Sequence, residues 1–63
     1  MYYRVGIATD PQPEDPYCDT QQEAIEKAKR RADCDFRLPV AVWEGERGEI
    51  VWLFLMGEQF RRA

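Results

Sequence analysis

Apolar and polar side chains alternate at the start of the chain. Over residues 2–8, Tyr3, Val5 and Ile7 occupy every second position. A period of two residues is typical of a strand, so we predict a strand over 2–8. Gly6 lies inside this stretch, and a glycine weakens a strand unless another backbone approaches closely there.

The period becomes helical after Thr20. Thr20 and Glu23 have the spacing of a capping box, in which each side chain accepts a hydrogen bond from the backbone of the other. A narrow apolar stripe follows at helical spacing, made of Ala24, Ile25, Ala28 and Ala32. We therefore predict a helix over 21–33 that lies close to a sheet but covers little apolar area.

Two further strands are predicted, over 38–44 and over 49–56. Pro39 cannot donate to a strand ladder, which favours an edge position for the first of them. The second is apolar at nearly every position, which indicates a central strand covered on both faces. Between them we expect a turn over 45–48 with Gly48 in the left-handed conformation. This register sets Glu44 opposite Ile50 and Val42 opposite Trp52.

These elements predict an α+β fold in one domain spanning residues 1–63. A strand–helix–strand unit crosses over right-handed and leaves its two strands parallel. Placing the third strand between them gives a three-stranded mixed sheet of order 1-3-2, with the helix on one face. Residues 9–19 then form an acidic, proline-rich loop, and residues 58–63 form a short tail.

One helix covers one face of such a sheet, and the pattern does not say which. The other face then exposes a row of apolar side chains, and exposed apolar patches of this kind mark interaction sites. We therefore expect a homodimer through the open sheet face. The large side chains expected at this contact are Trp43, Trp52, Phe54 and Met56. The two tryptophans also have an alternative role as core residues or as platforms for stacking bases.

The composition removes most catalytic arrangements. The chain has no histidine, serine or asparagine, which excludes Ser-His-Asp, Cys-His and Ser-Lys sites. We expect no enzymatic activity, no cofactor and no metal site. Cys18 and Cys34 lie on opposite sides of a helix that spans roughly 20 Å, too far for a disulfide without refolded loops. Cys18 precedes a helix, where thiolates are favoured, but Asp15 and Asp19 oppose this.

The acidic loop is the first candidate for partner binding. Its candidate residues are Asp10, Glu14, Asp15, Tyr17 and Asp19, with Tyr17 as an aromatic anchor. A solvated connection is the alternative interpretation. Calcium binding is a second one, although the spacing and glycine of a calcium loop are missing.

A basic cluster supports an alternative function in nucleic-acid binding. Its members are Lys27, Lys29, Arg30, Arg31 and Arg37. The same residues also suit the C-terminal end of a helix dipole. The formal net charge of −3 argues against a general nucleic-acid binder, and larger proteins remain the favoured partners.

Three segments of the chain form a pattern: Thr20-x-x-Glu23-Ala24-Ile25-x-x-Ala28, Pro39-Val40-Ala41-Val42-Trp43-Glu44 and Gly48-Glu49-Ile50-Val51. Together they resemble a recurring pattern in short uncharacterised bacterial and phage proteins. The matching positions carry a helix cap, a core and a hairpin, so no ligand residues are transferred. The resemblance implies a small accessory or phage-encoded factor.

The expected function is a non-enzymatic protein-interaction module, with a phage or bacterial regulator or inhibitor as its sharpest form. Two unpaired cysteines and the absence of a basic-then-apolar leader favour a cytoplasmic location. The longest apolar run, residues 50–56, is shorter than the ~20 residues that cross a bilayer.

Overall fold

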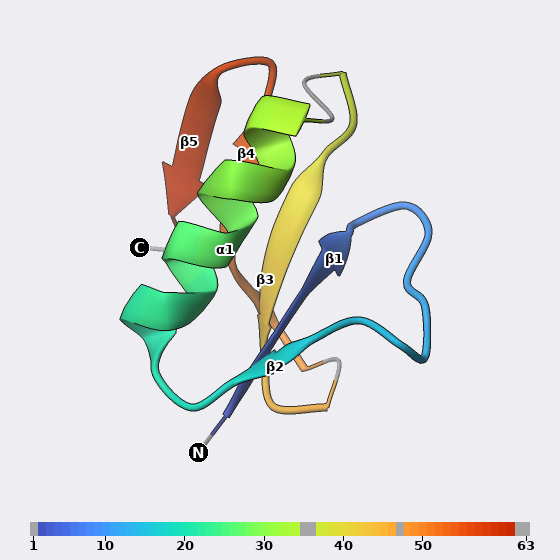
Figure 1. Cartoon of the computed structure of the whole chain (residues 1–63), viewed down its shortest axis with the longest axis vertical. Coiled ribbons are helices and arrows are strands. Elements are labelled where there is room, and N and C mark those ends of the chain that lie inside the picture. Colours follow the sequence, from blue (N-terminus) through green and yellow to red (C-terminus); the bar gives the residue numbers. More distant parts are fainter. Residues whose placement is uncertain (1, 35–36, 47, 62–63) are drawn as a thin grey trace.

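The alternating residues near the start of the chain form strand β1 in a computed structural model that describes residues 2–34, 37–46 and 48–61. In these ranges one helix packs on a five-stranded sheet (Figure 1). The elements in chain order are β1 (Tyr3–Ile7), β2 (Tyr17–Cys18), α1 (Gln21–Cys34), β3 (Val40–Glu44), β4 (Ile50–Leu55) and β5 (Glu58–Arg61). The α+β class predicted from the sequence is confirmed.

The strand order corrects the predicted topology. The sheet runs β2-β1-β3-β4-β5, and each described pairing is antiparallel. The prediction of three strands in the order 1-3-2, with a parallel pair, is therefore wrong. The cause is β2, which reverses the chain before α1 begins, so that β3 returns antiparallel to β1 (Figure 1).

Strand β3 lies in the middle of the sheet, so the predicted edge position of residues 38–44 is wrong. Pro39 precedes β3, and its carbonyl accepts a hydrogen bond from the Ala8 N–H at 2.8 Å. A proline at the start of a strand removes no bond from the ladder. Strand β4, predicted to be the centre, lies between β3 and β5 instead.

Two segments outside the predicted strands join the sheet. Tyr17–Cys18, inside the predicted loop, pairs with β1, and the predicted tail supplies β5. A two-residue hairpin connects β4 to β5, with φ of 50° at Met56 and 83° at Gly57. Positive φ at both central residues is the type I′ arrangement, whose twist matches that of the strands it joins.

The turn between β3 and β4 differs in detail from the prediction. Val42 pairs with Trp52 as predicted, but Ile50 lies opposite Trp43 and not Glu44. The register shift falls between Val42 and Trp43, and Val51 is the extra residue. The left-handed glycine is Gly45, at φ 69°, so the prediction for Gly48 is wrong. The Gly48 N–H donates to the Glu44 carbonyl at 3.1 Å.

The core lies between α1 and one face of the sheet. The helix begins where Thr20 Oγ1 accepts a hydrogen bond from the Glu23 N–H at 3.2 Å, which confirms the Thr20 half of the predicted capping box. Ala24 and Ala28 are fully buried against Val40 and Val42 of the middle strand and their neighbours. The same cluster contains Tyr3, Val5, Ile7, Cys18, Val51 and Phe54. Within the described ranges, no helix has the length and apolar character needed to span a membrane.

Candidate functional site

The sheet face turned away from α1, here called the distal face, divides into two parts. Because side chains alternate along a strand, Arg4 and Gly6 of β1 share this face with Ala41 and Trp43 of β3. It continues across Ile50, Leu53 and Leu55 of β4 to Phe60 of β5. The part over β1 carries a buried charge, and the part over β4 and β5 carries exposed apolar side chains.

Arg4 organises the first part. Its side chain is buried, with 3% of the residue's surface exposed. Its Nη2 donates to the Pro13 carbonyl at 2.9 Å and to the Asp15 carbonyl at 2.8 Å. Its Nη1 forms an ion pair with Glu46. Although burial by itself lowers the pKa of Arg4, the hydrogen bond and charge of Glu46 raise it. Arg4 therefore joins the proline-rich loop, β1 and the β3–β4 turn.

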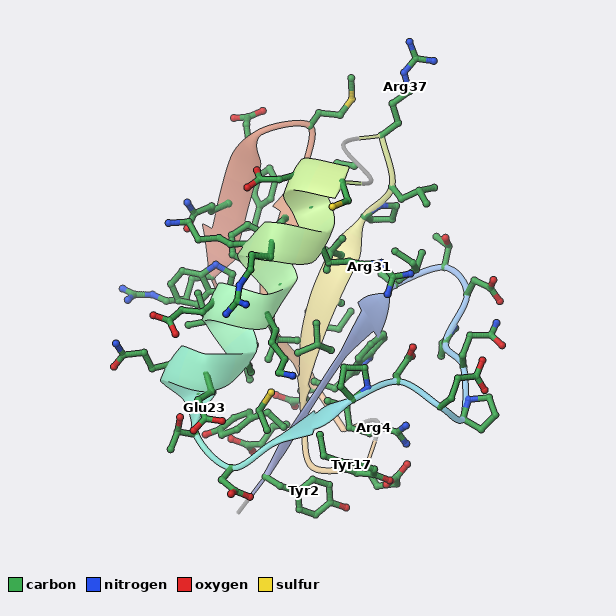
Figure 2. All side chains as sticks on the ribbon, viewed as in Figure 1. Tyr2, Arg4, Tyr17, Glu23, Arg31 and Arg37 are labelled. Carbon is green, nitrogen blue, oxygen red and sulfur yellow. The ribbon has the colours of Figure 1, made fainter. Side chains whose placement is uncertain are left out.

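Tyr17 completes this cluster. Its hydroxyl donates to Glu46 at 2.7 Å, and the Arg4 guanidinium carbon lies 4.2 Å from the centre of its ring. Tyr2 packs edge-on against the same ring, with centroids 5.3 Å apart. Tyr2, Arg4 and Tyr17 lie together at one end of the molecule (Figure 2). The hydrogen bond to Glu46, followed by burial, raises the pKa of Tyr17.

Asp15 anchors the loop on Gly6. Its carboxylate occupies the space where a side chain at position 6 would begin, because a Cβ on Gly6 would lie 2.2 Å from Asp15 Oδ2. The same Oδ2 accepts a hydrogen bond from the Gln12 N–H at 3.0 Å. The group that approaches Gly6 closely is therefore the Asp15 side chain, and not a second backbone.

The predicted partner-binding residues of the loop separate into two groups. Asp15 and Tyr17 make internal contacts, and both lie near Arg4. Asp10, Glu14 and Asp19 are exposed, and Asp10 accepts a hydrogen bond from Gln12 Nε2 at 2.7 Å. The acidic loop is thus a folded segment with an exposed acidic rim. Whether that rim binds a partner stays a prediction.

The second part of the distal face is a cluster of apolar side chains on β4 and β5, here called the hairpin patch. It consists of Ile50, Leu53, Leu55 and Phe60. Phe60 is 50% exposed and Ile50 is 39% exposed, while Leu53 and Leu55 are half-buried. Leu53 and Phe60 are direct cross-strand partners. A patch of this kind binds by excluding water from apolar surface.

The four aromatic and apolar residues predicted at an oligomer contact do not share one surface. Phe54 is 5% exposed and lies in the core beneath α1, with Trp52 half-buried beside it. Trp43 is 6% exposed and lies on the distal face opposite Arg4. Met56 is exposed in the turn between β4 and β5. The sequence pattern does not reveal Phe60 as a surface residue of a strand, because residues 58–63 lack alternation and are predicted to be a tail.

The predicted basic cluster is exposed but spread out. Lys27, Lys29, Arg30 and Arg31 lie on α1, and Arg37 follows the helix. Arg37 extends from the end of the molecule opposite to Arg4 and Tyr17 (Figure 2). Nucleic-acid binding by these residues stays a prediction, which retention on an immobilised duplex or single strand at low salt would test.

The remaining candidate sites are small. A shallow pocket of about 170 Å³ lies between the end of α1 and the β4–β5 hairpin, below the roughly 300–1,000 Å³ of small-molecule sites. Its lining residues are Lys29, Ala32, Asp33, Phe54, Gly57, Glu58 and Gln59.

Burial raises the pKa of the Cys18 thiol, which opposes a reactive thiolate. Among the described residues, no group of three or more Cys, Asp or Glu side chains is placed to hold a metal ion.

Comparison with protein-family models, with curated proteins and with solved structures found no match to this chain. The resemblance to short bacterial and phage proteins therefore stays a prediction. The hairpin patch is the candidate site that the geometry favours.

Proposed function

We propose that this chain is a small non-enzymatic protein-interaction module that binds another protein through the hairpin patch. One observation carries the proposal: neighbouring positions of β4 and β5 present large apolar side chains to solvent on one face. Burying such a side chain contributes roughly 1.5–3 kcal/mol, so several together supply the affinity of a specific contact.

The rest of the distal face is covered by the chain itself, so the hairpin patch is the part left open to a partner. The Arg4 cluster covers the part over β1 and holds the proline-rich loop against it. The exposed acidic residues Asp10 and Glu14 lie on that loop, where charges steer partners more than they add affinity. A basic partner with an apolar segment is the kind of protein that suits this arrangement.

The cellular setting is part of the same proposal. A small regulator or inhibitor encoded by a bacterium or phage, acting in the cytoplasm, is its most specific form. The free thiols of Cys18 and Cys34 are compatible with a reducing compartment.

The proposal is tested by capturing partners from a lysate of the source organism on the immobilised chain. The test variant combines Ile50→Thr and Leu55→Thr, because threonine removes apolar surface but keeps strand propensity. Leu38→Gln is the matched control, since Leu38 is an exposed apolar residue outside the patch. Proteins retained by the wild type and by Leu38→Gln should be lost from the double variant. Equal retention by a double variant with a wild-type circular dichroism spectrum would overturn the proposal.

A further inference from the structure

Strand β5 ends the sheet with an open edge. Each of its residues, Glu58 to Arg61, is exposed, and in the described part of the chain it pairs with β4 alone. An open edge of this length is a template for another strand. We infer that a second copy of this chain adds its own β5 there, antiparallel, so that two sheets become one across a two-fold axis at Phe60.

The backbone register determines which groups face outward. The turn at Met56 and Gly57 joins Leu55 and Glu58, which exchange hydrogen bonds as the ends of a two-residue hairpin loop. Hydrogen-bonded and non-hydrogen-bonded pairs alternate along an antiparallel ladder. The backbone groups of Glu58 and Phe60 therefore point to β4, and those of Gln59 and Arg61 point outward.

This alternation selects one register for the dimer. A two-fold axis normal to the sheet keeps both distal faces on the same side, so directly opposite residues must share a face. Placing Phe60 opposite Phe60 of the second copy satisfies that condition. It also sets each Gln59 opposite Arg61, so that the outward backbone groups of both residues are paired in both chains.

The side chains complement one another in this register. The two Phe60 rings meet on the distal face, beside Leu53, where a cross-strand aromatic pair adds to the stability of the sheet. On the opposite face, the Gln59 amide oxygen accepts from the Arg61 guanidinium of the second copy.

The other edge of the sheet, strand β2, explains why the association stops at a dimer. Strand β2 has two residues, follows Pro16, and joins Tyr17 to the Arg4–Glu46 cluster. Short edges next to prolines resist pairing. A chain can therefore add at β5 and not at β2, which gives a closed dimer and not a filament.

This inference rests on the proposed function, because the dimer joins two hairpin patches into one continuous apolar surface. Partner binding and dimer formation can be tested independently of each other. Ile50 and Leu55 lie on β4, away from the dimer edge, so their double variant should lose the partner and remain dimeric.

Sedimentation equilibrium from micromolar to millimolar concentration tests the dimer. The wild type should reach twice the 7.5 kDa of one chain. Gln59→Pro removes an outward N–H without touching the β4 ladder, so it should weaken the dimer about tenfold or more. Gln59→Ala, which keeps that N–H, should remain dimeric. A wild type that is monomeric throughout, or a dimer unaffected by Gln59→Pro, would overturn the inference.

Disulfide trapping tests the register in a Cys34→Ala background. Phe60→Cys should form an interchain disulfide on mild oxidation, because opposite residues of a non-hydrogen-bonded pair lie within disulfide range. Glu58→Cys is the matched control on the same face, since the two Glu58 positions are separated by four residues along the strand. Crosslinking of Glu58→Cys in preference to Phe60→Cys would contradict this register.

Discussion

Gly6 and Asp15 share one small space on the distal face. A methyl group at position 6 would overlap the Asp15 carboxylate, since Asp15 Oδ2 lies 2.2 Å from the ideal Cβ position. Asp15 is itself buried and bonded to the Gln12 N–H, so it has little room to move. This contact between β1 and the proline-rich loop depends on the absence of a side chain at position 6.

We expect Gly6→Ala to lower the free energy of unfolding by about 1–3 kcal/mol, the usual cost of overpacking a tight site. Urea denaturation of the wild type and the variant measures this cost. In an Asp15→Ala background the same substitution should cost less, because the overlapping carboxylate is gone. An equal cost in both backgrounds would show that the contact with Asp15 is not its cause.

Tyr17 should make stability depend on alkaline pH. Its hydrogen bond to Glu46 raises its pKa above the ordinary 10.0, so the folded state holds the phenol proton more tightly than the unfolded state does. This contribution is complete below pH 10.0 and is lost as the pH rises through the folded-state pKa. The stability advantage of the wild type over Tyr17→Phe should therefore shrink across that interval.

Urea denaturation of both proteins on either side of pH 10.0 provides the measurement. Tyr2→Phe retains the bond between Tyr17 and Glu46 and should follow the wild type. A difference between wild type and Tyr17→Phe that stays constant with pH would contradict the role of Glu46.

The hairpin between β4 and β5 carries an uncommon residue in its turn. Met56 has a φ of 50°, a left-handed conformation in which side chains other than Asn, Asp and Gly are strained. Gly57 follows with a φ of 83°, so an Asn-Gly pair would satisfy the type I′ turn. The turn is formed although its first residue disfavours it.

We expect Met56→Asn to raise the free energy of unfolding by about 0.5–1 kcal/mol, because it relieves that strain in an exposed position. Thermal and urea unfolding measure the gain. Met56→Leu keeps a β-carbon and an apolar side chain and should be neutral. A loss of stability in Met56→Asn would mean that the Met56 side chain makes a contact of greater value than the strain.

Regular elements were predictable where the pattern had enough repeats. The helix predicted over 21–33 is α1, one residue longer, and its cap at Thr20 is formed as predicted. The pairing of Val42 with Trp52 was also predictable. Strand β2 was not, because Tyr17 and Cys18 are too few residues for an alternating pattern and follow a proline.

The missed parts share a physical cause. Phe60 is the one large apolar residue in β5, so its segment does not alternate, and its strand exists because a turn at Met56 returns it to β4. Arg4 has the sequence position of a solvent-facing strand residue. Contacts with Pro13 and Asp15, 9 and 11 positions away, and with Glu46, 42 positions away, bury it. Long-range contacts of this kind leave no local signal.

At the scale of the whole molecule, a chain of 63 residues buries a limited core, and self-association would add to its stability. If β5 pairs with a second copy, mass action makes the unfolding temperature depend on protein concentration. We expect the midpoint of thermal unfolding to rise with concentration for the wild type and to stay constant for Gln59→Pro. Differential scanning calorimetry over a range of concentrations measures this, and a constant midpoint for both proteins would argue against a stabilising dimer.

The antiparallel pairing of β1 with β3 has a consequence for how the molecule assembles. Strand β1 lies between β2 and β3, and its ladder with β3 joins Tyr3 to Glu44 across most of the chain. Strands β3, β4 and β5 are consecutive in the sequence and neighbours in the sheet, so they can pair across short connections. Pairing β1 with β3 closes the much longer stretch of chain between them and costs more chain entropy. Of the described strand pairings, β1 with β3 therefore spans the longest stretch of chain, and we expect it to form after β3, β4 and β5 have paired.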